Sequence, residues 1–203
     1  MATRELGSAA QAESKGAAAE PSGVYVKRPG QGHFGRQSMA PLSIEKEFEA
    51  LSVLYGVAPG LVARPLGIVH EGGQAVGYSM ERVNGLSVYD ALGKWAVAEA
   101  DDGAVDSALR GIARYARDVT MKGYVHGDLN RQNVMLEMSG GRLTGGVKII
   151  DPRAMQDSPG KKELLERDLA GLRRVVGEIL VERGIMGEAK ERYIKDIGFP
   201  AAT

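Results

Sequence analysis

The sequence predicts an α+β fold, in which a small antiparallel sheet with one helix precedes a larger and mainly helical part. Short runs of β-branched and aromatic residues, separated by turn-forming residues, lie between positions 24 and 80. Apolar residues then recur at helical spacing over residues 109–120 and 163–183. Two further apolar runs, 134–136 and 147–150, lie between these helices and adjoin polar residues.

In the N-terminal part, Val24–Lys27 is expected to form a strand, because β-branched and aromatic residues favour one. A helix over residues 43–55 follows, with Ser43 as its cap. Its apolar face consists of Ile44, Phe48, Leu51 and Tyr55. Residues 66–80 predict a hairpin with its turn at residues 71–73.

From Leu86 onward the pattern is helical, with a polar break at residues 99–106. The helix after this break ends at Gly123, a residue type that commonly ends helices. Its apolar face consists of Leu109, Ile112, Ala113, Ala116, Val119 and Thr120. A second amphipathic helix spans residues 163–183, and the tail from Gly187 is helical up to Gly198.

The length and composition indicate one soluble domain. A chain of 203 residues, 43% of them hydrophobic, can bury a core within one domain of two small lobes. Lys+Arg and Asp+Glu both number 26, so no basic excess points to nucleic acid or an anionic membrane as the main partner. The absence of Cys excludes disulfides and thiolate zinc sites. Residues 1–23 lack the pattern of a secretory signal peptide, and we expect a monomer.

The chemistry concentrates in two short stretches, residues 124–136 and 147–153. In the first, Asp128 and Asn133 precede an apolar strand; in the second, an apolar strand delivers Asp151 into a turn. Phosphoryl transfer from ATP needs one carboxylate at the acceptor hydroxyl, and an amide with a second carboxylate on the magnesium ions. Oxygen ligands suit this hard cation. Asp128, Asn133 and Asp151 are thus the residue types that a phosphotransferase using ATP and Mg²⁺ would need.

These stretches resemble the catalytic and metal loops of the protein-kinase-like superfamily. The resemblance implies a minimal bilobal kinase-like fold, with an N-lobe over about residues 1–83 and a reduced helical C-lobe over 84–203. Asp128 would be the catalytic carboxylate, with Asn133 and Asp151 as the metal ligands and Met135 as the floor of the adenine site. His126 would be structural, packing beneath the loop. Asp168 either anchors the catalytic loop or lies on the surface of its helix.

The N-terminal elements carry the same resemblance. It implies that Lys27 binds the α- and β-phosphates of ATP, and that Glu47 on the following helix pairs with Lys27. The stretch 80–83 resembles a kinase hinge, where backbone groups of Glu81 and Val83 would meet adenine. Met80 fits equally as the gatekeeper residue beside adenine or as plain core packing.

Two stretches compete for the glycine-rich loop that covers the phosphates. Residues 4–16 resemble a degenerate version with Gly7 as its first glycine, although residues 1–23 also fit a disordered leader. Residues 30–35 match Gly-x-Gly-x-x-Gly, but a helix follows them where a Lys-bearing strand is expected. We therefore expect Gly7 at the nucleotide and residues 30–35 in a connection.

Several positions depart from the kinase pattern. Gly127 replaces the Arg that receives an activating phosphate, and Asn130 replaces a phosphate-neutralising Lys. Tyr25, two residues before Lys27, would narrow the adenine site. Pro152 biases Asp151 toward an extended conformation and disfavours a flipping metal loop. Only 17 residues (168 − 151) separate Asp151 from Asp168, which leaves no room for a long activation segment, so we expect a constitutively competent kinase.

In compactness and loop style the chain resembles the HopBF family of minimal type III secreted effector kinases. This implies a protein serine/threonine kinase that acts in the host cytosol and phosphorylates the HSP90 chaperone. Two alternatives remain open. One is an atypical kinase or ATPase of the Bud32 or RIO groups, or a small-molecule phosphotransferase, acting in the bacterial cytoplasm. The other is a nucleotide-binding pseudokinase or an interaction module that mimics a chaperone client.

Overall fold

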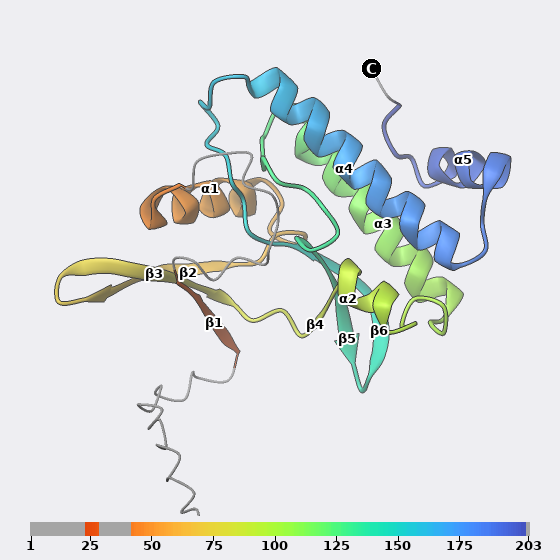
Figure 1. The fold of residues 1–203 in the computed structure, drawn as a ribbon, viewed down its shortest axis with the longest axis horizontal. Helices are drawn as coiled ribbons and strands as arrows, with labels where there is room; N and C mark the ends of the chain where they lie inside the picture. The colour runs from red at the N-terminus through yellow and green to blue at the C-terminus, as the bar shows by residue number, and fades with distance from the viewer. Residues whose placement is uncertain (1–22, 29–41, 202–203) are drawn as a thin grey trace, which may run out of the picture.

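The computed structural model describes residues 23–28 and 42–201, and the predictions for Gly7 and residues 30–35 lie outside them. Two three-stranded antiparallel sheets and five α-helices make up the described chain. Figure 1 shows the first sheet with α1 at one end of the molecule and the helices α3, α4 and α5 at the other. This is the α+β class, with a small N-terminal sheet and a mainly helical C-terminal part, and the predicted fold class is confirmed.

The first sheet has the strand order β1-β3-β2, from β1 (Val24–Lys27), β2 (Pro65–Glu71) and β3 (Gln74–Glu81). A two-residue turn joins β2 to β3, and its Gly72 and Gly73 have φ of 58° and 82°. Positive φ at both positions is typical of hairpin turns and favours glycine. Helix α1 (Ile44–Val57) packs against β2 and β3, and the Lys46 backbone N–H donates to Ser43 Oγ at 3.4 Å. The predicted hairpin and capped helix are confirmed.

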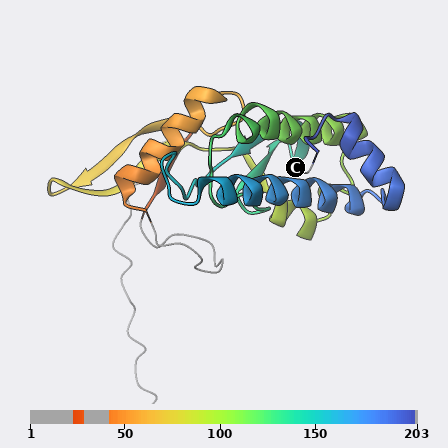
Figure 2. The same cartoon turned by 90° about the horizontal axis from the view of Figure 1, so that it is seen from above.

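The second sheet has the order β4-β5-β6, from β4 (Gly85–Ser87), β5 (Val134–Ser139) and β6 (Arg142–Ile149). Helix α3 (Asp102–Asp118) covers β6, and α4 (Lys161–Glu182) runs beside α3, as the view from above in Figure 2 shows. The short elements are α2 (Val88–Gly93), the 3₁₀ turn η1 (Thr120–Lys122) and α5 (Gly187–Asp196).

Two expectations about the middle of the chain were wrong. Residues 85–87 form a strand, because they pair with β5 and lie too close to its backbone for a helix: a Cβ on Gly85 would meet the Leu136 carbonyl oxygen at 2.2 Å. The polar break does not extend to residue 106, since α3 begins at Asp102. Asp101 accepts hydrogen bonds from the backbone N–H groups of Gly103 and Ala104, so acidic residues start this helix.

One hydrophobic cluster joins both parts of the described chain, from Leu51 and Leu54 of α1 to Ile179 of α4. The backbone adds a second link. The Ile149 N–H donates to the Leu61 carbonyl, and the Ala63 N–H donates to the Ile149 carbonyl. The strand that delivers Asp151 is thereby tied to the segment after α1. Among the described residues no helix has the length and apolar character needed to cross a bilayer.

Candidate active site

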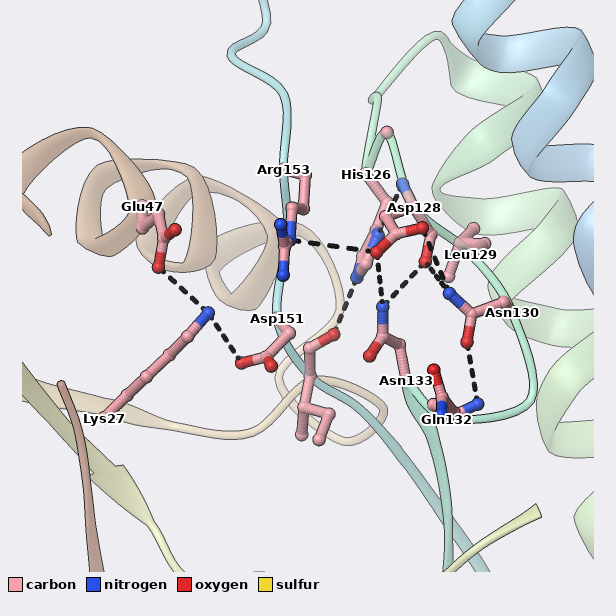
Figure 3. A network of polar contacts seen from close by, with 12 residues as sticks. Lys27, Glu47, His126, Asp128, Leu129, Asn130, Gln132, Asn133, Asp151 and Arg153 are labelled. Carbon is pink, nitrogen blue, oxygen red and sulfur yellow. Dashed lines mark hydrogen bonds and ion pairs between the residues drawn. The ribbon is translucent and has the colours of Figure 1, made fainter. Parts of the chain in front are cut away.

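Lys27, Glu47 and Asp151 meet where the first sheet faces the end of β6. The Lys27 Nζ lies 2.9 Å from a Glu47 carboxylate oxygen and 3.2 Å from Asp151 Oδ1 (Figure 3). The Lys27 side chain is only 7% exposed, and these two carboxylates compensate the cost of burying its ammonium group. The Tyr78 ring lies beneath, with its centroid 5.8 Å from the Nζ. The expected pairing of Lys27 with Glu47 is present, and Glu45 and Glu49 are exposed.

The loop between η1 and β5 is held from below by Asp168 of α4. This carboxylate is fully buried and accepts hydrogen bonds from the backbone N–H groups of His126, Gly127 and Leu129. The charge helps because backbone donors bind an ionised oxygen more strongly than a neutral one. Two roles were considered for Asp168, and the structure supports the first: Asp168 anchors the loop backbone and does not lie on the surface of its helix.

His126 also supports this loop and is fully buried. Its Nε2 lies 2.8 Å from the Ile150 carbonyl oxygen, which can only accept, so the Nε2 carries the proton. The Nδ1 accepts the backbone N–H of Asp128 at 3.3 Å. Burial lowers the pKa of His126, although the Asp168 carboxylate opposes this shift, and the ring stays neutral. The geometry supports a structural role for this side chain.

The Asp128 carboxylate is oriented by two amides. Asn130 Nδ2 donates to its Oδ1 at 3.0 Å, and Asn133 Nδ2 donates to its Oδ2 at 3.2 Å. Both amides also donate to the Asp128 carbonyl oxygen. The Asp128 side chain nevertheless remains 43% exposed, so an acceptor molecule can reach it. In the sequence, Asn130 stood out only as the replacement of a phosphate-neutralising lysine. In the structure it is a positioning residue for the Asp128 carboxylate.

Asp151 lies in the left-handed region, with φ of 61°. The expectation of an extended conformation was wrong. Proline after it disfavours the right-handed helical region, and aspartate tolerates left-handed backbone better than most residues. The hydrogen bonds on each side impose the bend: the Ile150 N–H donates to the Asn133 carbonyl, and the Arg153 N–H donates to the His126 carbonyl. The metal loop is thus tied to the catalytic loop directly before and after Asp151.

Gly127 is required by a close contact with the metal loop. It has φ of 86°, and a Cβ there would lie 2.6 Å from the Ala154 Cβ and 3.0 Å from the Ala154 backbone nitrogen. Gly127→Ala should therefore lower the free energy of unfolding by about 2 kcal/mol or more, from left-handed strain together with overpacking. Chemical denaturation measures this loss.

Gly184→Ala is the matched control. Gly184 also has a left-handed φ, 71°, but a Cβ at this position would have no heavy atom of the described neighbours within 4 Å. This variant should lose only about 1 kcal/mol, the cost of the backbone conformation alone. Equal losses in the two variants would contradict the contact argument.

The residues expected to face adenine are Met135 on β5, Glu81 at the end of β3 and Val83 in the connection that follows β3. Met135 pairs with Lys148 across the strands, and Lys148 forms an ion pair with Glu81 at 2.9 Å. The Glu81 N–H is taken by the Arg64 carbonyl, so this group is not available to adenine. The Val83 backbone has no hydrogen bond within residues 23–28 and 42–201, which leaves its groups for a ligand.

Met80 and Tyr25 line the neighbouring part of the first sheet, where their strands pair directly. Met80 is 3% exposed and belongs to the hydrophobic core, so core packing accounts for it. Tyr25 is 37% exposed and shares a strand face with Lys27. Its ring is accessible on the side of the sheet where the nucleotide is expected.

The donor set fits a magnesium ion bound together with phosphate. The Asn133 amide nitrogen is committed to Asp128, and its oxygen makes no hydrogen bond within the described chain. That oxygen and the Asp151 carboxylate are hard ligands. No three His, Cys, Asp or Glu side chains of the described residues gather into a metal cluster. One amide oxygen and one carboxylate suit Mg²⁺, which commonly uses one or two protein ligands and completes its shell with phosphate and water.

A RIO domain family model matches residues 22–186 of the chain. The chain belongs to the RIO domain family. This atypical protein-kinase-like family lies within the kinase-like superfamily that the two loops indicated, so the coarser part of the resemblance is confirmed. The match begins after the stretch that contains Gly7. A search of curated proteins finds no significant match to the chain.

The sequence pattern assigned no role to two arginines of this RIO domain that contact the loop carrying Asp128. Arg167 Nη2 donates to the Gly127 carbonyl at 2.6 Å, and Arg153 Nε lies 3.8 Å from Asp128 Oδ2. Each directly adjoins a motif position, since Arg167 precedes Asp168 and Arg153 follows the Asp-Pro pair. That adjacency was the available signal, but a charged residue beside a motif is most often solvated and carries little weight by itself.

Proposed function

We propose that this RIO domain is an ATP-dependent phosphotransferase that works as an atypical kinase or ATPase. One observation carries the proposal. A carboxylate that two amides hold in place, Asp128, lies beside the Lys27–Glu47–Asp151 ion-pair cluster, as Figure 3 shows. Phosphoryl transfer depends mainly on positioning and on neutralised charge. This arrangement supplies both.

Each residue has a role in the proposed reaction. The acceptor oxygen bonds to the γ-phosphorus while the bond from that phosphorus to the bridging oxygen of ADP breaks, and the electron pair leaves with ADP. Asp128 orients the acceptor hydroxyl and takes its proton. Lys27, fixed by Glu47, binds the α- and β-phosphates. Asn133 and Asp151 would hold Mg²⁺, which neutralises charge on the phosphate oxygens when bound.

The family match supports the atypical kinase or ATPase more than the effector kinase that phosphorylates a serine of HSP90. The effector assignment, its HSP90 substrate, host-cytosol location and monomeric state stay predictions, based on compactness and loop style. The ion-paired Lys27 and the oriented Asp128 favour a catalyst over a pseudokinase, because an inactive fold has no need to keep both.

The experiment supplies the purified chain with γ-labelled ATP and Mg²⁺, alone and with bacterial extract, eukaryotic extract or purified HSP90. Label on protein supports a kinase, labelled inorganic phosphate in the absence of extract supports an ATPase, and label on small molecules supports a metabolite phosphotransferase. Labelled HSP90 would restore the effector assignment. A chain that neither binds nor consumes ATP would overturn the proposal.

Asp128→Asn is the matched variant for this experiment. Asparagine keeps the size of the side chain and loses the proton acceptor, so the transfer rate should fall by about 10²-fold or more. ATP binding should not weaken, because Asp128 faces the acceptor. A variant that transfers phosphate at the wild-type rate would remove Asp128 from the mechanism.

A further inference from the structure

Arg153 lies at the centre of the candidate site, and its backbone is held by neighbouring contacts. The buried Pro152 fixes the chain before it, and the Arg153 N–H donates to the His126 carbonyl at 2.7 Å. Figure 3 shows its side chain between the Lys27–Glu47–Asp151 cluster and Asp128. The same short segment therefore presents Asp151 and this guanidinium to one space.

The contact between Arg153 and Asp128 is loose. At 3.8 Å, the distance from Arg153 Nε to Asp128 Oδ2 is too long for a hydrogen bond. The Nε is buried and has no hydrogen-bond partner within the described chain, although the side chain as a whole is 34% exposed. A buried donor without a partner is costly, so this N–H group is available to donate a hydrogen bond to a better placed anion.

Among the cations described around the site, Arg153 is the one placed to bind a further anion. Lys27 already forms ion pairs with Glu47 and Asp151, and Arg167 donates a hydrogen bond to the Gly127 carbonyl. Asn130 of the catalytic loop is neutral and oriented toward Asp128. Within residues 23–28 and 42–201, Arg153 is the cation that forms an ion pair with Asp128. Charge that develops on a transferring phosphate needs such a partner.

We propose that Arg153 binds the γ-phosphate of ATP during transfer and leaves Asp128 as it does so. The inference rests on the proposed function and adds a catalytic residue to it. In the free protein the arginine neutralises Asp128; with ATP bound, the guanidinium turns to the γ-phosphate oxygens and frees Asp128 for the acceptor. The planar fork of arginine suits this task, because two parallel N–H groups match two phosphate oxygens.

The test compares nucleotide binding and turnover in Arg153→Gln, Arg153→Lys and the wild type. ADP lacks the γ-phosphate, so Arg153→Gln should weaken ATP binding about tenfold and ADP binding less than about twofold. The kcat should fall by about 10²-fold or more. Arg153→Lys should recover part of the ATP affinity but little of kcat, because it keeps the charge without the fork. Arg142→Gln, at an exposed arginine that begins β6, is the charge-matched control.

The outcomes separate this inference from the alternatives. Equal losses of ATP and ADP affinity in Arg153→Gln would overturn it and make Arg153 a structural support of the loops. Unchanged affinity for both nucleotides, with an altered pH profile of kcat, would also overturn it and leave Arg153 as a partner of Asp128 alone. A wild type that binds neither nucleotide contradicts the proposed function itself, which the ADP measurement reveals independently of Arg153.

Discussion

Asp151→Ala should lower the rate of phosphate transfer by about 10³-fold or more. The substitution removes the carboxylate that would hold Mg²⁺, and it also removes one of the two anions beside Lys27. Lys27 keeps Glu47 at 2.9 Å, so the fold should survive. Steady-state turnover over a range of Mg²⁺ concentrations measures the effect, and raising the metal concentration should restore only a small part of the rate.

Asp157→Ala is the control for this prediction. Asp157 is exposed and follows Asp151 in the same connection to α4, so it changes the local charge by the same amount without touching the site. Its turnover should match that of the wild type. If Asp151→Ala turns over at the wild-type rate, the assignment of the metal site to Asp151 is wrong.

Asp168→Ala should destabilise the protein by about 3 kcal/mol or more. The carboxylate is fully buried and satisfies three backbone N–H groups of the catalytic loop. Each buried donor that loses its partner costs about 1–3 kcal/mol. The free energy of unfolding from chemical denaturation measures the loss.

Asp157→Ala serves again as the control and should change stability by less than about 0.5 kcal/mol, as exposed substitutions usually do. Asp168→Asn separates shape from charge. Its amide oxygen can accept some of the three hydrogen bonds, so it should lose less stability than the alanine variant. A loss in Asp168→Ala no larger than that of the control would contradict the anchor role.

Much of the fold could be predicted because its elements carry strong local signals. Helix α1 begins directly after its cap, Ser43. Helix α4 is indicated by apolar residues that recur at helical spacing, and the hairpin by the Gly72-Gly73 turn between its strands. The short strand over residues 85–87 was missed because three residues carry no readable period, and only pairing with β5 makes them a strand. The start of α3 was missed because acidic residues at a helix start also look like a polar loop.

The sequence by itself indicated which residues to propose for the chemistry: residue type and order pointed to Asp128, Asn133 and Asp151, and the resemblance to kinases pointed to the Lys27–Glu47 pair. Only the tertiary structure decided how they are held. Asp168 lies on a helix that the sequence leaves free to face solvent, and packing against the catalytic loop buries it. The left-handed Asp151, the tight contact at Gly127 and the position of Arg153 depend on two loops meeting in space. Contacts between segments distant along the chain leave no local periodicity from which to predict them.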